Sequence, residues 1–175
     1  MPYWYILFVN TGREHHLSNW INQRFSDKHL KSFFPTRELF YKKSGNAYTR
    51  ILTMFPGYLF IETEICSTEF LQHIWFIIKT SEDIIRILKY GDSDEITLQE
   101  DECRELKRLL NNDHCVELSV GFIEGDKIIV QEGPLMGRES IIKKINRHKR
   151  EAFIDLEIMG GVRRVKIGLE VLKRI

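Results

Sequence analysis

The sequence predicts an α+β fold in two parts, an N-terminal sheet flanked by helices and a small C-terminal β-barrel. Before residue 112, runs rich in β-branched and aromatic residues alternate with stretches in which apolar residues recur at helical spacing. From about Val120 onward the runs are short and alternate apolar with polar residues, and turn signals separate them. We therefore expect an N-terminal domain at 1–111, a linker at 112–119 and a C-terminal domain at 120–175.

The first strand and helix are marked by composition and by a helix-start signal. "YWYILFV" at 3–9 is rich in aromatic and β-branched residues, which is typical of a strand buried on both faces. Thr11 and Glu14 have the spacing of a capping box, in which each side chain accepts a hydrogen bond from a backbone N–H at a helix start. Leu17 and Ile21 follow at helical spacing, so we expect a helix of about three turns here.

The other N-terminal elements are predicted from the same periodicities. We expect strands at 33–41, 51–64 and 83–90, a hairpin turn at 42–50, and helices at 67–78 and within 97–112. Pro56–Gly57 interrupts the second of these strands. The order is therefore β-α-β-β-α-β-α, which predicts one sheet with helices packed on it.

In the C-terminal part, "IIKKINRHKREAFI" at 141–154 places a basic cluster between two apolar runs. Ile142 and Ile145 cannot both point into a regular strand's core, because side chains alternate with a period of two. A bulge or strong twist at Lys143–Lys144 would resolve this conflict and re-aim the lysines outward. "VRRVKIG" supplies a second basic row, which would widen the surface if it lies on the same side of the barrel.

The charge distribution favours an anionic partner for the C-terminal domain. The formal net charge is +1, but residues 1–119 carry 14 Lys and Arg against 17 Asp and Glu, while residues 120–175 carry 12 against 8. Cys66, Cys103 and Cys115 form no CxxC pair, so free thiols in a cytoplasmic protein are the simplest interpretation. No apolar run reaches a transmembrane length, so no membrane partner is expected.

The sequence contains no pattern that predicts catalysis. "REHH" lacks the HExxH spacing that puts two metal ligands on one helix face, and "GDSDE" lacks the glycine and distal glutamate of a calcium loop. No glycine-rich phosphate loop follows a strand, and no nucleophile is paired with a base. We therefore expect no enzymatic activity, no catalytic residue, no metal and no cofactor.

Three segments resemble a known family. "WYILFVNTGRE" at the start, "FPGYLFIE" at 55–62 and "GDKIIVQEGPLMGRESIIKKINRHKREAFIDLEIMGG" at 125–161 are similar to the NusG family of transcription elongation factors. The first two resemble its N-terminal NGN domain and the third its SH3-like KOW domain. The short hairpin, the brief linker and the basic KOW domain most resemble specialised LoaP-type processive antiterminators.

The resemblance implies two partners for a monomeric protein. The NGN domain would dock on the clamp helices of the RNA polymerase largest subunit, and the KOW domain would bind an RNA hairpin in a nascent leader transcript. The implied polymerase-binding residues are Phe8, Phe55, Tyr58 and Phe60, although their pattern alone equally fits core aromatics. Specialised paralogs are also implied to touch non-template DNA; the candidates here, with His15 beside them, are Arg13, His16 and Trp20.

The candidate RNA-binding residues come from the two basic rows. They are Lys143, Lys144, Arg147, His148, Lys149, Arg150, Arg163, Arg164 and Lys166. A charged turn that only solvates the barrel is the alternative interpretation. Two other functions also fit: a general NusG-type elongation or pausing factor whose KOW domain recruits Rho or a ribosomal protein through Phe122 and Phe153, and a stand-alone RNA-binding protein.

Overall fold

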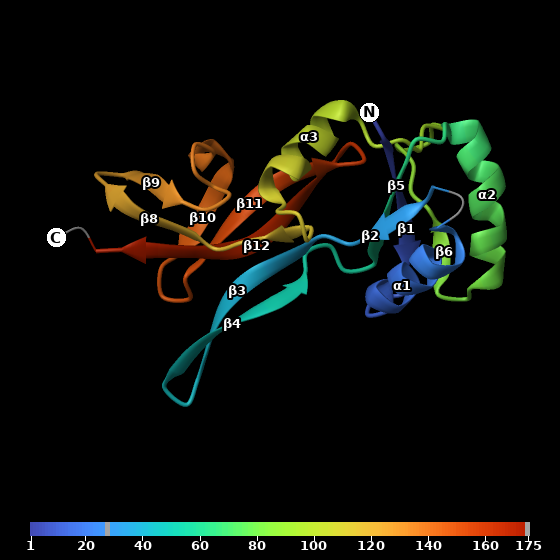
Figure 1. The fold of residues 1–175 in the computed structure, drawn as a ribbon. Coiled ribbons are helices and arrows are strands. Elements are labelled where there is room, and N and C mark those ends of the chain that lie inside the picture. The colour runs from blue at the N-terminus through green and yellow to red at the C-terminus, as the bar shows by residue number, and fades with distance from the viewer. Residues whose placement is uncertain (27–28, 174–175) are drawn as a thin grey trace. The chain divides into compact units, whose positions relative to one another are not determined.

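The computed structural model describes residues 1–26 and 29–173, and the chain forms two compact units (Figure 1). Unit 1 comprises Met1–Phe34 and Phe55–Cys103, and unit 2 comprises Pro35–Met54 and Arg104–Ile175. Strands and helices occur in both, so the α+β prediction is confirmed. The units group residues by compactness, whereas the predicted linker at 112–119 divides the chain by sequence position; those domain boundaries stay a prediction.

Unit 1 is a sheet with the strand order β2-β5-β1-β6 and two helices. Its elements are β1 (Tyr3–Val9), α1 (Glu14–Arg24), β2 (Lys31–Phe33), β5 (Tyr58–Thr63), α2 (Ser67–Thr80) and β6 (Ile84–Ile87). β1 is antiparallel to both β5 and β6. Because β1 has a strand on each side, its apolar run is buried, as its composition predicted.

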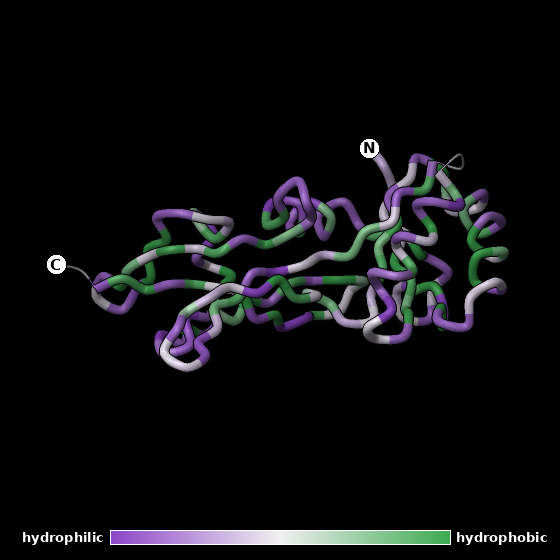
Figure 2. The backbone as a smooth tube through the Cα atoms, turned by 60° about the horizontal axis from the view of Figure 1, so that its bottom comes forward, coloured by the Kyte–Doolittle hydropathy of each residue, from purple (hydrophilic) through white to green (hydrophobic). Residues whose placement is uncertain are grey.

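The core of unit 1 lies between this sheet and the two helices. Tyr5 and Leu7 of β1 point to the same face, where they meet Leu17 and Ile21 of α1 in one buried cluster. The ring of Phe70, from α2, stacks on Tyr5 with the centroids 3.8 Å apart. Figure 2 shows the corresponding alternation, with hydrophobic strand interiors and hydrophilic connections.

Two predicted strands are each divided into two. β2 ends at Phe33 and β3 (Thr36–Lys43) begins after Pro35, because proline has no N–H to continue a ladder. Likewise β4 (Asn46–Thr53) ends before Pro56 and β5 starts after Gly57.

Unit 2 contains the β3–β4 hairpin, most of α3 (Glu100–Leu109) and the rest of the chain. β7 (Cys115–Val116) pairs in parallel with β3, giving the strand order β4-β3-β7. The predicted linker at 112–119 therefore contains a short strand that is hydrogen-bonded to the hairpin.

The remaining strands form the C-terminal sheet, with the order β10-β11-β12-β8-β9. They are β8 (Ser119–Glu124), β9 (Lys127–Glu132), β10 (Ile142–Asn146), β11 (Glu151–Ile158) and β12 (Gly161–Leu172). β12 pairs with β11 along its first part and with β8 along its last residues, so the sheet bends. A 3-10 turn at Glu139–Ile141 precedes β10, and the Glu139 carboxylate accepts a hydrogen bond from the backbone N–H of Val130 on β9 at 3.0 Å.

Candidate nucleic-acid interface

Phe8 and Tyr58 form the accessible part of the predicted polymerase-binding patch. They are cross-strand partners on β1 and β5, and their rings meet edge to face with centroids 6.3 Å apart. Both side chains are half-buried. The Phe55 ring stacks on Tyr58 at 6.2 Å, and the Arg86 guanidinium lies over Phe8 at 5.8 Å. The patch is therefore an ordered aromatic surface with a cation at its edge.

The turn before Tyr58 is held by a buried carboxylate. Glu14 accepts hydrogen bonds from the backbone N–H of Gly57 at 2.6 Å and of Gly12 at 2.8 Å. Gly57 has a φ of +86°, and a Cβ there would lie 3.1 Å from the Phe8 ring. Only glycine therefore fits this close approach without strain, and Glu14 fixes the turn beside Phe8.

This arrangement corrects the capping-box prediction for Thr11 and Glu14. Helix α1 begins at Glu14, its N-cap residue is Arg13, and no side-chain hydrogen bond caps it. Glu14 sits one position too early to serve as the third helical residue of the motif. Its carboxylate instead joins the Gly12 loop to the Gly57 turn, a role that sequence spacing did not reveal.

Phe55 and Phe60 lie behind this surface rather than on it. Their exposed fractions are 6% and 0%. The Phe60 ring lies 5.4 Å from Phe33 and 6.0 Å from Trp4, between centroids. All four predicted polymerase-binding residues are thus neighbours, but Phe8 and Tyr58 carry the exposed ring area.

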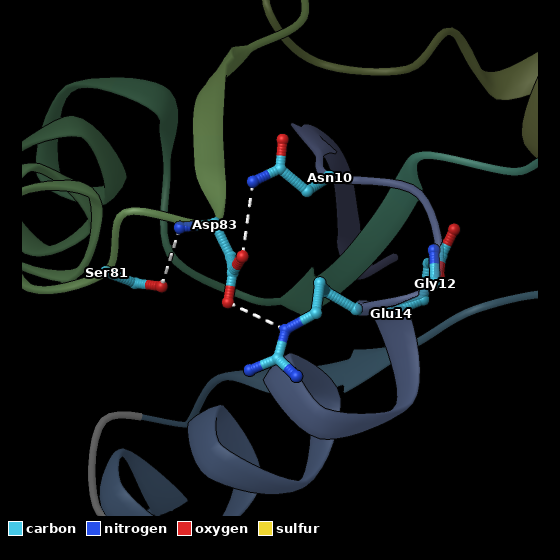
Figure 3. Close-up of polar contacts among 6 residues, drawn as sticks. Asn10, Gly12, Glu14, Ser81 and Asp83 are labelled. Atoms are coloured by element: carbon cyan, nitrogen blue, oxygen red, sulfur yellow. Dashed lines mark hydrogen bonds and ion pairs between the residues drawn. The ribbon is translucent and has the colours of Figure 1, made fainter.

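The candidate DNA contacts at the start of α1 do not make one charged surface. Arg13 Nε donates a hydrogen bond to Asp83 at 2.8 Å, and Asn10 Nδ2 donates to the other carboxylate oxygen at 3.2 Å (Figure 3). The bond from Arg13 lowers the pKa of Asp83 below its usual value. His16 is exposed, while Trp20 is half-buried with its ring edge to face against Phe25 at 5.6 Å.

The predicted bulge in the basic hairpin is confirmed. Ile142 pairs with Ile154 and Lys144 pairs with Phe153, so Lys143 is the extra residue of β10. Phe153 in turn pairs with Lys166 on β12. Lys144, Phe153 and Lys166 therefore share one rung and one face of the C-terminal sheet, which brings the two basic rows together.

Acidic side chains from neighbouring strands neutralise part of this basic surface. Arg164 makes two hydrogen bonds to Asp155, at 2.8 and 3.1 Å, and these lower the pKa of Asp155. Lys166 Nζ lies 3.5 Å from Glu151, and Arg150 lies 3.9 Å from Glu170. Sequence reasoning missed these pairs because the acids are distant along the chain from the bases they meet.

The turn between β10 and β11 keeps its charge. Arg147, His148 and Lys149 are exposed, and within residues 1–26 and 29–173 none of them forms an ion pair. The Asn146 side-chain oxygen accepts a hydrogen bond from the Lys149 backbone N–H at 3.1 Å, which orders the turn. We call residues 147–150 the basic turn.

A groove of about 640 Å³ separates the basic turn from the β3–β4 hairpin, within unit 2. It is lined by Leu39, Phe40, Tyr41, Lys42, Gly45 and Ala47 from the hairpin, and by His148, Lys149, Arg150, Glu151 and Lys166 from the C-terminal sheet. The groove therefore gathers four of the predicted RNA-binding residues. Arg147, the two lysines of the bulge, Arg163 and Arg164 do not line it.

Sequence reasoning missed the hairpin side of this groove. The Arg150 guanidinium lies over the Phe40 ring at 5.3 Å, and Arg50 lies over Tyr41 at 5.2 Å. The alternation of aromatic and basic residues along 40–50 was visible, but nothing local indicated that this segment faces the basic turn.

Comparison with known proteins places the whole chain. The family model for the transcription termination factor NusG matches residues 2–107. The chain belongs to the NusG family. The transcription termination/antitermination protein NusG of Thermus thermophilus is 25% identical to it over 166 residues, which cover 90% of each chain. A solved structure of Thermotoga maritima NusG, described by a domain interaction, has a TM-score of 0.50 and 19% identity, and the match covers 97% of this chain and 94% of that one.

The likeness to the solved NusG structure concerns the fold alone, whereas the family match carries a general function. Proteins of the NusG family are transcription factors that bind RNA polymerase and are not enzymes. The NusG resemblance expected from the sequence is therefore confirmed.

Other classes of site were sought in this NusG-family chain. Among residues 1–26 and 29–173, no group of three or more His, Cys, Asp or Glu side chains could hold a metal ion. The three cysteines are free, and burial raises the pKa of the Cys115 thiol. No helix in the described residues has both the length and the apolar character needed to cross a membrane.

Proposed function

We propose that this protein is a transcription antitermination factor of the NusG family. It binds RNA polymerase through the patch around Phe8 and Tyr58, and it binds a hairpin in the nascent leader RNA through its basic turn. The observation that carries the RNA-binding part is the charge balance of the C-terminal sheet. Arg164 and Lys166 are paired with acids, whereas Arg147, His148 and Lys149 are exposed and form no ion pair in the described part of the chain.

The polymerase contact is proposed for the clamp helices of the largest subunit. An exposed aromatic pair with buried aromatic support is typical of a protein-binding hot spot, because rigid rings bury large area with little loss of side-chain entropy. Glu14 supports this role, since it holds the Gly57 turn and with it the position of Tyr58.

The RNA contact is proposed as a combination of phosphate binding and base readout. Lysines at the bulge and in the basic turn would hold phosphates, and Arg147 would read bases where a loop or bulge opens the narrow A-form groove. An irregular hairpin therefore fits better than an uninterrupted duplex. Non-template DNA is the weaker candidate ligand, because Arg13 is engaged by Asp83.

Recruitment of Rho or a ribosomal protein through Phe122 and Phe153 is the second candidate. Both side chains are half-buried, and the Lys144 ammonium group lies over the Phe153 ring at 5.9 Å. That contact covers one of the two aromatics with a cation, which favours an anionic ligand at this rung over an apolar protein surface.

The test is binding of the full chain to the leader RNA of the operon that carries its gene, compared with a shuffled hairpin of equal length. Wild-type protein is expected to prefer the leader hairpin. Lys149→Ala should weaken binding to both RNAs and reduce the salt slope by about one phosphate contact, whereas Arg147→Ala should weaken mainly the leader hairpin. Lys127→Ala, at an exposed position on β9, is the matched control and should change little.

Equal binding of leader and shuffled hairpins by the wild type would contradict specific recognition. Purification with RNA polymerase separates the proposal from a stand-alone RNA-binding protein, because only a polymerase-binding factor is retained.

A further inference from the structure

We propose that the groove between the β3–β4 hairpin and the basic turn holds an unpaired nucleotide of the bound RNA. Its base would pack on the aromatic wall formed by Phe40 and Tyr41, and its phosphates would contact Lys42 and Lys149. This inference rests on the proposed RNA-binding function and adds the hairpin as a second half of the site.

The groove is a built feature of unit 2. Arg37 Nη1 donates a hydrogen bond to the backbone carbonyl of Lys166 at 2.6 Å, which ties β3 to β12. A Cβ at Gly168 would lie 2.8 Å from the Glu38 carbonyl oxygen and 2.3 Å from Leu118 Cδ2, so the hairpin and the C-terminal sheet approach as closely as glycine allows. Both walls are therefore positioned before any ligand arrives.

The aromatic wall suits a nucleobase. Tyr41 and Tyr48 are cross-strand partners with stacked rings whose centroids are 5.9 Å apart, and Arg50 lies over Tyr41. These contacts order the Tyr41 ring, so packing a base on it costs little side-chain entropy. Aromatic residues bind unpaired bases of any identity because every base has a π-face.

The charge and size of the groove favour one unpaired nucleotide over a duplex. Lys42, Lys149, Arg150 and Lys166 line it against a single acid, Glu151, which is bridged to Lys166. A volume of about 640 Å³ falls in the range of small-ligand sites, about 300–1,000 Å³, and cannot enclose a helix. A stacked duplex would also offer no free base face to Tyr41.

The experiment compares two labelled RNAs that share one stem, a hairpin with an unpaired loop and a blunt duplex, at low salt. Tyr41→Ala is expected to weaken binding of the looped RNA by about 5- to 100-fold, the range for one lost base–aromatic stack, and to leave the duplex nearly unchanged. Tyr41→Phe retains the ring and should bind like the wild type. Lys42→Ala should weaken the looped RNA, whereas the neighbouring Lys43→Ala, outside the groove, is the charge-matched control.

A second readout is independent of affinity. Looped RNA carrying 4-thiouridine in the loop is expected to crosslink on irradiation to a peptide that contains residues 40–42. Crosslinks confined to the C-terminal sheet would overturn the inference.

The outcomes separate this inference from the proposed function. If Lys149→Ala weakens binding but Tyr41→Ala and Lys42→Ala bind the looped RNA like wild type, the groove inference is wrong and the proposed function stands. If the wild type binds neither RNA, both are wrong. If Tyr41→Ala instead abolishes binding of a protein partner while RNA binding is unchanged, the groove is a protein site.

Discussion

Arg37 and Lys166, 129 positions apart, are joined by a hydrogen bond of 2.6 Å from the guanidinium Nη1 to the backbone carbonyl oxygen. Burial lowers the pKa of Arg37, while Tyr41 and Glu151 act in the opposite direction. The Nε atom of Arg37 is buried and has no hydrogen-bond partner among the described residues. The guanidinium therefore ties the hairpin to β12 while part of its own hydrogen-bonding capacity stays unused.

Removing this contact should loosen the hairpin. Arg37→Met keeps much of the side-chain length but loses the donor, so we expect the free energy of unfolding to fall by about 1–3 kcal/mol, as for a hydrogen bond from a charged group. Hydrogen exchange should increase in β3 and β4. Arg50→Met, at an exposed position of the same hairpin, is the control, and an equal loss for both variants would refute a special role for Arg37.

Glu14 should matter for both folding and polymerase binding. Glu14→Ala leaves the N–H groups of Gly12 and Gly57 without their acceptor, which we expect to cost about 2–3 kcal/mol in urea unfolding. Glu14→Gln retains one acceptor oxygen and should lose less. Because the Gly57 turn precedes Tyr58, polymerase affinity should fall in parallel, while Glu64→Ala at an exposed position should affect neither.

Tyr58 and Phe60 should behave differently although they are two residues apart. Tyr58→Ala is expected to fold and to lose polymerase in a pull-down, because its half-buried ring supplies contact area. Phe60→Ala should destabilise the fold by about 3–5 kcal/mol through a cavity in the core. Tyr3→Ala, an exposed aromatic on β1, serves as the control; retention of polymerase by folded Tyr58→Ala protein would disprove the assignment.

Asp155 should limit RNA affinity by occupying Arg164. Asp155→Asn removes the paired charge, so we expect tighter binding of all RNAs and a salt slope that is steeper by about one phosphate contact. Glu157→Gln changes the net charge equally at an exposed position on the same strand. The same slope change in both variants would mean that Arg164 itself makes no phosphate contact.

Asp83 should respond to pH through its bond with Arg13. Because this bond lowers the pKa of Asp83 from 3.8, its contribution is complete above that value and is lost as the pH falls through the lowered pKa. The chemical shift of the Asp83 carboxyl carbon, followed by NMR, should therefore titrate below 3.8, and in Arg13→Gln protein it should titrate closer to 3.8. An unchanged titration would mean that Arg13 is not the cause.

Sequence patterns were informative where the deciding interaction is local. The conflict between Ile142 and Ile145 predicted the bulge at Lys143, since alternation within one strand is a property of neighbouring residues. Pro56 and Gly57 likewise marked a real strand boundary. The capping box failed because Thr11 and Glu14 have the right spacing, but the helix starts later than the motif assumes.

By itself the sequence determined the family, the order of most elements and the presence of a basic segment, because these follow from composition, periodicity and motif. Only the tertiary structure decided which charges on that segment remain exposed, since Asp155 and Glu151 reach Arg164 and Lys166 through strand pairing. It also decided that Tyr41 and Lys42 face Lys149 across a groove. Pairings between strands and the docking of a hairpin on a sheet depend on contacts between distant residues, which no local pattern encodes.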